Sequence, residues 1–141
     1  MLVRCLYASR AVEPIAVGAL DRILEKSRKN NFPRGVTGLL CYSNGTFVQA
    51  LEGGREIVSD LLGTIYSDNR HSGLQVLMFE EIAERHFGNW SMGRVNLDTV
   101  NSASLLKYSI RAELNPFNMP GSATLALLME LAAAGSIASR G

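Results

Sequence analysis

The stretch that decides the fold reads GVTGLLCYSNGTFVQALEG and runs from residue 35 to residue 53. Two apolar runs, Val36–Tyr42 and Thr46–Glu52, flank the dipeptide Asn44-Gly45. A type I′ turn needs positive φ at both central residues, and asparagine and glycine adopt such angles most readily. The pattern therefore predicts a β-hairpin that forms the second and third strands of a sheet.

Strand and helix patterns continue on both sides of this hairpin. Before it, the side chains of Leu2–Ala8 alternate with strand period, and a helix begins at Pro14. This helix ends near Asn30–Pro33, because the residue before a proline disfavours the helical region. After the hairpin the pattern predicts an amphipathic helix and two strands: Arg55–Tyr66, Leu74–Glu80 and Trp90–Val95.

This order of elements predicts an α+β fold, the ferredoxin-like sandwich, βαββαβ with a fifth strand added. The first and third strands lie side by side in its centre, and both helices cover one face. Leu6, Ala8, Val48 and Ala50 point to the other face. We expect two C-terminal helices, Asn101–Leu114 and Ser122–Ser139, to cover it, with Ser122 as a helix cap. Residues 1–97 would then form one domain, and residues 98–141 a helical extension packed on the sheet.

Composition and charge exclude several classes of protein. Hydrophobic residues make up 47% of the 141 residues and charged residues 19%, which argues against disorder and fibrous repeats. The net charge of +1 offers no electrostatic footprint for nucleic acid or for anionic membranes. The two cysteines, Cys5 and Cys41, lie in apolar runs without metal-ligand spacing, so we expect free thiols in a cytoplasmic protein and no metal site. Neither a signal peptide nor a membrane span is expected.

Two polar side chains lie on faces that are otherwise apolar. Gln49 stands between Phe47 and Leu51 on one face of the third strand, and Tyr7 continues the apolar face of the first strand. If these strands are neighbours, both side chains enter the core beneath the helices. A buried amide and a buried phenol each need hydrogen-bond partners, at a cost of about 1–3 kcal/mol when these are missing. The pair either satisfies itself with ordered water or borders a bound ligand.

Other polar residues converge on the same region, although each has an ordinary alternative role. Asn31 lies two helical turns after Leu24 on the apolar face of the first helix, where a helix C-cap is the alternative. Asp68, Arg70 and His71 follow the second helix and by themselves indicate a solvated turn. Polar groups aimed into a seam between two helices and a sheet describe a cofactor slot.

The motifs of several enzyme classes are missing from the sequence. It contains no GxGxxG, no GxxxxGK[ST] and no HExxH. Neither His71 nor His86 has a positioned serine or cysteine partner. Hydrolytic and phosphoryl-transfer chemistry therefore has no visible residues to carry it, and no catalytic residue is expected.

With these residues the sequence resembles the BLUF family, the photoreceptors that use FAD to sense blue light. The resemblance extends from Met1 to Val95 and rests on five blocks in order. These are LVRCLYAS, the Asn30-Asn31 pair, the hairpin with Gln49, SDNRH, and FGNWSMGRV with Trp90 and Met92. The resemblance implies a ferredoxin-like fold with a fifth strand and a flavin between the two helices, which agrees with the slot inferred above.

The resemblance also implies roles for individual residues. Tyr7 and Gln49 would be the photoactive pair, with Trp90 and Met92 of the fifth strand beside them. Asn31 would hydrogen-bond the polar edge of the flavin ring. The other residues implied to bind the cofactor are Ser9, Ile23, Asn30, Ile65, Asp68, Arg70, His71 and Met92, with Ile23 and Ile65 on the two ring faces. Asn30 departs from the family pattern, because some members have histidine there.

The function that the resemblance implies is reversible light sensing and not catalysis. An electron and then a proton would pass from Tyr7 through the Gln49 amide to the excited flavin and return, which leaves Gln49 rotated or tautomerised. Trp90 and Met92 are two residues apart on the predicted fifth strand, so a two-residue slip would exchange them on the same face. The signal would pass to a downstream protein in trans or to a second copy of the chain. The alternatives are a ferredoxin-like ligand-binding or interaction module without flavin, and a flavin-dependent oxidoreductase.

Overall fold

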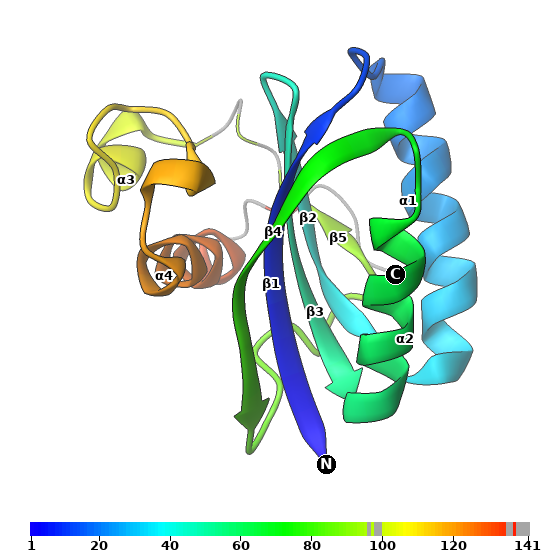
Figure 1. The fold of residues 1–141 in the computed structure, drawn as a ribbon. Helices are drawn as coiled ribbons and strands as arrows, with labels where there is room; N and C mark the ends of the chain where they lie inside the picture. Colours follow the sequence, from blue (N-terminus) through cyan, green and yellow to red (C-terminus); the bar gives the residue numbers. More distant parts are fainter. Residues whose placement is uncertain (96, 98–99, 135–136, 138–141) are drawn as a thin grey trace.

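The computed structural model describes residues 1–95, 97, 100–134 and 137, whose fold is shown in Figure 1. Strands and helices follow one another in the predicted order as far as the fifth strand. In chain order the elements are β1 (Leu2–Ala11), α1 (Val17–Asn31), the 3₁₀ helix η1 (Phe32–Arg34), β2 (Thr37–Ser43), β3 (Thr46–Gly54), α2 (Arg55–Tyr66), β4 (His71–Ile82), β5 (Gly93–Arg94), α3 (Ser102–Leu106), the 3₁₀ helix η3 (Pro116–Asn118) and α4 (Gly121–Ala133).

The strands form one sheet in the order β4-β1-β3-β2-β5, so the prediction that β1 and β3 lie side by side is confirmed. All neighbours are antiparallel except β2 and β5, which are parallel. The hairpin is also confirmed, because Asn44 and Gly45 at its turn have φ angles of 50° and 73°. Strand β4 begins at His71, earlier than predicted, because it pairs with β1 as far as Ala11. The polar segment after α2 is thereby attached to the sheet.

Helices cover both faces of this sheet, as predicted. Figure 1 shows α1 and α2 on one side and α3 and α4 on the other. The core under α1 and α2 contains Val3, Cys5 and Tyr7 of β1, whereas Leu6 and Ala8 pack into the opposite core. That opposite core also receives three leucines of α4: Leu127, Leu128 and Leu131. The alternation along β1 therefore divides the molecule into two apolar layers.

The fifth strand is shorter than the predicted Trp90–Val95, and this corrects the placement of two residues. In the described part of this segment, strand pairing with β2 is limited to Gly93–Arg94, so Trp90 and Met92 lie in the irregular segment before β5. Trp90 packs in the core under α3 and α4, whereas Met92 packs in the core under α1 and α2. Residues two apart share a face only where the backbone is extended and paired. The expectation that both face the same way, and would exchange by a two-residue slip, is therefore wrong.

The C-terminal helices are also shorter than predicted. Helix α3 starts after Asn101, whose side chain caps it, and ends at Leu106 and not at Leu114. The next two residues, Lys107 and Tyr108, both hydrogen-bond Glu130 of α4, which directs the chain toward that helix.

Helix α4 has different ends from those predicted for the last helix. It starts at Gly121 with Pro120 at the cap position, so Ser122 is inside the helix and is not its cap. It ends at Ala133, and Ile137 then pairs with Val95. The predicted end at Ser139 lies outside the described residues.

Helix α4 packs closely on the sheet at its first residue. A Cβ added to Gly121 would lie 2.6 Å from the backbone oxygen of Leu77, so only glycine allows this approach to β4. Among the described residues, no helix is both long and apolar enough to cross a bilayer. The division into a domain of residues 1–97 and a helical extension of residues 98–141 stays a prediction.

We predict that Leu127→Ala lowers the free energy of unfolding by about 2–5 kcal/mol, because it removes a fully buried side chain from the core under α4. Urea denaturation followed by circular dichroism measures this change. Leu106→Ala is the control, because Leu106 is 53% exposed; it should cost less than about 1 kcal/mol. Equal costs for the two substitutions would show that α4 does not stabilise the sheet.

Candidate functional site

A cavity of about 120 Å³ lies between α1, α2 and the sheet. The cavity combines apolar walls with several polar side chains. Its lining residues are Tyr7, Ile15, Ile23, Ser27, Asn31, Leu40, Phe47, Gln49, Leu61, Ile65, Asp68, Arg70 and His71.

Tyr7 and Gln49 form the polar floor of this cavity. They are direct partners in the β1–β3 register, and the Tyr7 hydroxyl donates to Oε1 of Gln49 at 2.5 Å. On its other side Nε2 of Gln49 donates to the sulfur of Met92 at 3.3 Å. A thioether is a weak acceptor, so a stronger acceptor in the cavity would compete for this amide. Tyr7 and Gln49 therefore form an oriented hydrogen-bond chain, and its last acceptor, the Met92 sulfur, is easily replaced.

Burial keeps the phenol of Tyr7 in its protonated form. Only 4% of the residue is exposed, and desolvation raises the pKa of the Tyr7 hydroxyl well above its usual value. The hydroxyl therefore serves as a hydrogen-bond donor over the whole physiological pH range.

Asn31 borders the same cavity from the end of α1. It is 2% exposed, and its Nδ2 donates to the backbone oxygen of Ser91 at 3.3 Å. The C-cap position of α1 is Phe32, so the alternative role of Asn31 as a C-cap is wrong. Arg28, one turn earlier, donates to the backbone oxygen of Met92 at 2.9 Å. Two side chains of α1 thus hold the segment that carries the Met92 sulfur to Gln49.

His71 connects three elements at the other end of the cavity. Its Nε2 lies 2.6 Å from the backbone oxygen of Ile65 in α2, and its Nδ1 lies 2.7 Å from the Ser9 hydroxyl in β1. A carbonyl can only accept, so Nε2 carries the hydrogen, and Nδ1 of the neutral ring accepts from Ser9. Ser9 is thus a serine partner of His71, contrary to the expectation from the sequence, and it does not line the cavity itself.

Asp68 and Arg70 form an ion pair at the rim. Two guanidinium nitrogens of Arg70 contact the carboxylate, the shorter contact being 2.5 Å. The hydrogen-bonded guanidinium of Arg70 lowers the pKa of the Asp68 carboxyl to about 2. Arg70 also lines a second, open groove next to the cavity, together with Arg22 and Lys26 of α1. An apolar slot thus leads into a basic groove.

The structure places most of the predicted residues in the cavity lining. Ser9 lies outside the lining, behind His71, and two further predicted residues lie away from the site. Ile23 and Ile65 line the cavity from α1 and α2, and Met92 lies directly behind Gln49. Asn30 is exposed and outside the cavity lining, because one residue along a helix turns the side chain by about 100°. Trp90 lies in the core on the opposite side of the sheet. Both are corrections to the predicted arrangement.

Five residues that line the cavity were not predicted from the sequence: Ile15, Ser27, Leu40, Phe47 and Leu61. Ser27 lies four residues from both Ile23 and Asn31, and Phe47 lies two residues before Gln49. Helical and strand periodicity therefore place Ser27 and Phe47 on the same faces as the predicted site residues. Leu40 is placed only by its pairing with Gln49 in the β2–β3 register. In the described part of the chain no group of His, Cys, Asp or Glu side chains could hold a metal ion.

Comparison with known families gives a match over most of the chain. The family model described as "Sensors of blue-light using FAD", BLUF, matches residues 2–93. The photoactivated adenylate cyclase subunit beta of Euglena longa is 32% identical over 87 residues, which are 61% of this chain and 10% of that protein. The blue light- and temperature-regulated antirepressor BluF of Escherichia coli (strain K12) is 28% identical over 92 residues, 65% of this chain and 23% of that protein. The chain thus spans between a tenth and a quarter of these two relatives.

Solved structures match over nearly the whole chain. BlsA in its photo-activated state has a TM-score of 0.85 and 31% identity, and the match covers 100% of this chain and 99% of BlsA. BlrB, a BLUF protein in its dark state, has a TM-score of 0.75 and 30% identity, with coverage of 95% and 96%.

The Asp68–Arg70 ion pair predicts a pH dependence of stability. The pKa of Asp68 is lower in the folded chain than its usual value near 4, so the folded state gains stability above about pH 4 and loses it as the pH falls toward about 2. Asp68→Asn should flatten the fall of the urea midpoint over this range. Glu25→Gln is the control, since its pairing with Lys29 is 3.9 Å long and exposed. Parallel pH profiles of the parent and Asp68→Asn would contradict the assignment.

Proposed function

The chain belongs to the BLUF family of blue-light sensors, which bind flavin, and from this premise we propose that Tyr7 and Gln49 are its photoactive pair. The observation that carries the proposal is the 2.5 Å hydrogen bond between them at the cavity floor. A flavin supplies ring atoms that accept hydrogen bonds and, under blue light, a strong one-electron oxidant.

The residues of the cavity fit such a ring. Ile23 and Ile65 lie on opposite helices, one for each face of a planar group. The Gln49 amide has only a sulfur as its acceptor, and the Asn31 amide is buried at the same cavity. Amide hydrogens at this position suit a ring edge whose nitrogen and oxygen atoms are acceptors.

In the proposed photocycle Tyr7 donates an electron and a proton and then takes both back. Its buried, protonated hydroxyl points at Oε1 of Gln49, so the amide is placed to carry the proton. Return of the electron and the proton leaves the composition unchanged and the Gln49 amide rotated or tautomerised. The new amide orientation alters the contact between Nε2 and the Met92 sulfur. A light signal is thereby converted into a different hydrogen-bond pattern at the segment before β5.

We further propose that the chromophore is FAD. The groove that adjoins the cavity is lined by three cationic side chains, Arg22, Lys26 and Arg70, with Glu13 as the opposing charge in the groove and Asp68 as the ion-pair partner of Arg70. Guanidinium and ammonium groups bind phosphate oxygens well. A flavin whose chain carries phosphates would therefore place them in this groove. Mass spectrometry of the flavin released from purified protein distinguishes FAD from FMN.

The partner of the sensor is proposed to be a protein in trans that contacts the C-terminal helices, with a second copy of the chain as the alternative. Residues after Met92 lead directly to that side of the sheet. A Cβ on Gly93 would lie 2.8 Å from a methyl carbon of Ile137 and 3.0 Å from the Trp90 ring. Movement near Met92 would thus reach the C-terminal side without a long path. The buried free thiols of Cys5 and Cys41 support a cytoplasmic location.

We predict that the purified protein is yellow and that its flavin bands shift to the red in blue light and recover in darkness. Tyr7→Phe removes the electron and proton donor, and Gln49→Leu removes the amide. Both variants should retain flavin, because most lining residues are unchanged, and both should lose the shifted state. Absorption spectra before and after illumination measure this. A normal photocycle in Tyr7→Phe would overturn the role of the pair, and rapid bleaching by a nicotinamide donor would favour the oxidoreductase alternative.

Asn31→Ala should weaken flavin binding roughly five- to twelvefold, which corresponds to one buried hydrogen bond of about 1–1.5 kcal/mol. Titration of flavin into the refolded apoprotein measures the dissociation constant. The matched control is Asn30→Ala, because Asn30 is the exposed neighbour on the same helix. Unchanged affinity in Asn31→Ala would show that Asn31 holds only Ser91 and not the ligand.

A further inference from the structure

The segment between β4 and β5 crosses the whole sheet. These strands are at its opposite edges, so residues 83–92 must pass over the strands between them. Phe87 and Trp90 of this segment are buried in the core on the α4 side, whereas Met92 emerges at the cavity side. We call residues 83–92 the crossing segment. It delivers the Met92 sulfur to Gln49.

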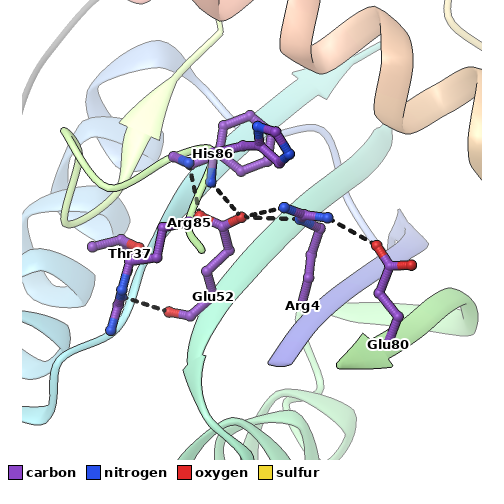
Figure 2. A network of polar contacts seen from close by, with 7 residues as sticks. Arg4, Thr37, Glu52, Glu80, Arg85 and His86 are labelled. Carbon is purple, nitrogen blue, oxygen red and sulfur yellow. Dashed lines mark hydrogen bonds and ion pairs between the residues drawn. The ribbon is translucent and has the colours of Figure 1, made fainter. Parts of the chain in front are cut away.

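A row of polar side chains underlies the crossing segment. The strand registers pair Thr37 of β2 with Glu52 of β3, Glu52 with Arg4 of β1, and Arg4 with Glu80 of β4. Figure 2 shows these side chains from close by. Glu52 is fully buried and Arg4 is 4% exposed. The guanidinium of Arg4 contacts Glu52 at 2.9 Å and Glu80 at 2.8 Å, so charged groups connect three strands.

Glu52 binds the crossing segment as well as Arg4. Its carboxylate accepts from the backbone N–H of Phe87 at 2.7 Å and of His86 at 3.0 Å. Arg85 attaches the same segment to Thr37 Oγ1 at 2.8 Å and to the backbone oxygen of Glu52 at 3.1 Å. A buried ion pair is weak evidence for stability, since apolar residues of similar size often serve as well. Two backbone N–H groups aimed at one carboxylate, however, fix the position of a segment as apolar side chains cannot.

Only a short piece of chain separates this anchor from the photoactive pair. After Phe87, the Trp90 backbone oxygen accepts from the N–H of Gly38 at 3.0 Å. Ser91 and Met92 are then held by α1, and the Met92 sulfur reaches Gln49. Five residues of chain span at most about 18 Å, so the anchor at residues 86–87 and the Met92 sulfur are close along the chain.

We propose that Glu52 is a positioning residue of the light switch. Its carboxylate holds the crossing segment in the register in which Met92 accepts from Gln49, and it thereby sets the lifetime of the light-adapted state. Reorientation of the Gln49 amide has to displace Met92 against this anchor, so a looser anchor lowers the barrier to recovery. The inference rests on the proposed function, because it requires the Tyr7–Gln49 photocycle.

The test compares dark recovery of flavin-loaded parent and Glu52→Gln. Glutamine keeps the volume but replaces one acceptor oxygen with a donor, so one of the two N–H groups of residues 86–87 loses its partner. We expect recovery at least about threefold faster, with flavin occupancy unchanged, and a shifted ¹³C-methyl resonance of Met92. Glu80→Gln is the control: it changes the outer partner of Arg4 and leaves the contacts of Glu52 with the crossing segment intact. It should recover within about 1.5-fold of the parent rate.

The outcomes separate the failure of each proposal. A parent protein without flavin or without a red shift overturns the proposed function and this inference with it. A photocycling parent with unchanged or slower recovery in Glu52→Gln, or with equal acceleration in Glu80→Gln, overturns this inference alone. A lower melting temperature without a change in recovery or in the Met92 resonance shows a merely structural role. If Glu52→Gln does not fold, dark recovery is measured in Arg85→Gln instead. Recovery in this variant should also be faster than in the parent. A recovery rate equal to that of the parent overturns the proposal.

Discussion

The antiparallel register between β1 and β3 is the constraint on which the rest of the structure depends. It places Tyr7 directly opposite Gln49 on one face of the sheet and Arg4 directly opposite Glu52 on the other. A slip of β3 by one residue would turn Gln49 and Glu52 to the wrong faces. The amide would then enter the apolar core under α4, and the carboxylate would enter the cavity. One register thus fixes both the Tyr7–Gln49 pair and the buried charges.

The two polar pairs differ in how completely their hydrogen bonds are satisfied. Glu52 accepts from a guanidinium and from two backbone N–H groups, which are strong and well-placed partners. Gln49 receives a strong bond from Tyr7 but donates to a sulfur atom. A group with a weak partner reorients at low cost, whereas a group with several charged or backbone partners does not. The Gln49 amide on the cavity side is therefore free to reorient, whereas the Glu52 carboxylate on the opposite face is held in place.

The two faces of the sheet also differ: one presents the cavity, and the other is covered by a helix. The face under α1 and α2 presents a cavity lined by apolar and polar side chains. The opposite face is covered by α4, with Leu127, Leu128 and Leu131 in its core. The crossing segment contributes to both layers, with Trp90 in one core and Met92 in the other. It is therefore the piece of chain through which the two faces are connected.

The sequence by itself determined the features that follow from regular local geometry. The alternation along strands placed Tyr7 and Gln49 on one face, the Asn44-Gly45 turn set the hairpin, and helical periodicity placed Ile23 and Asn31 on one face of α1. Only the tertiary structure decided that Trp90 and Met92 lie on opposite sides and that Glu52 anchors residues 86–87. Periodicity holds only within a regular element. In an irregular segment, the direction of a side chain depends on contacts with residues far away in the sequence, such as the one between Met92 and Gln49.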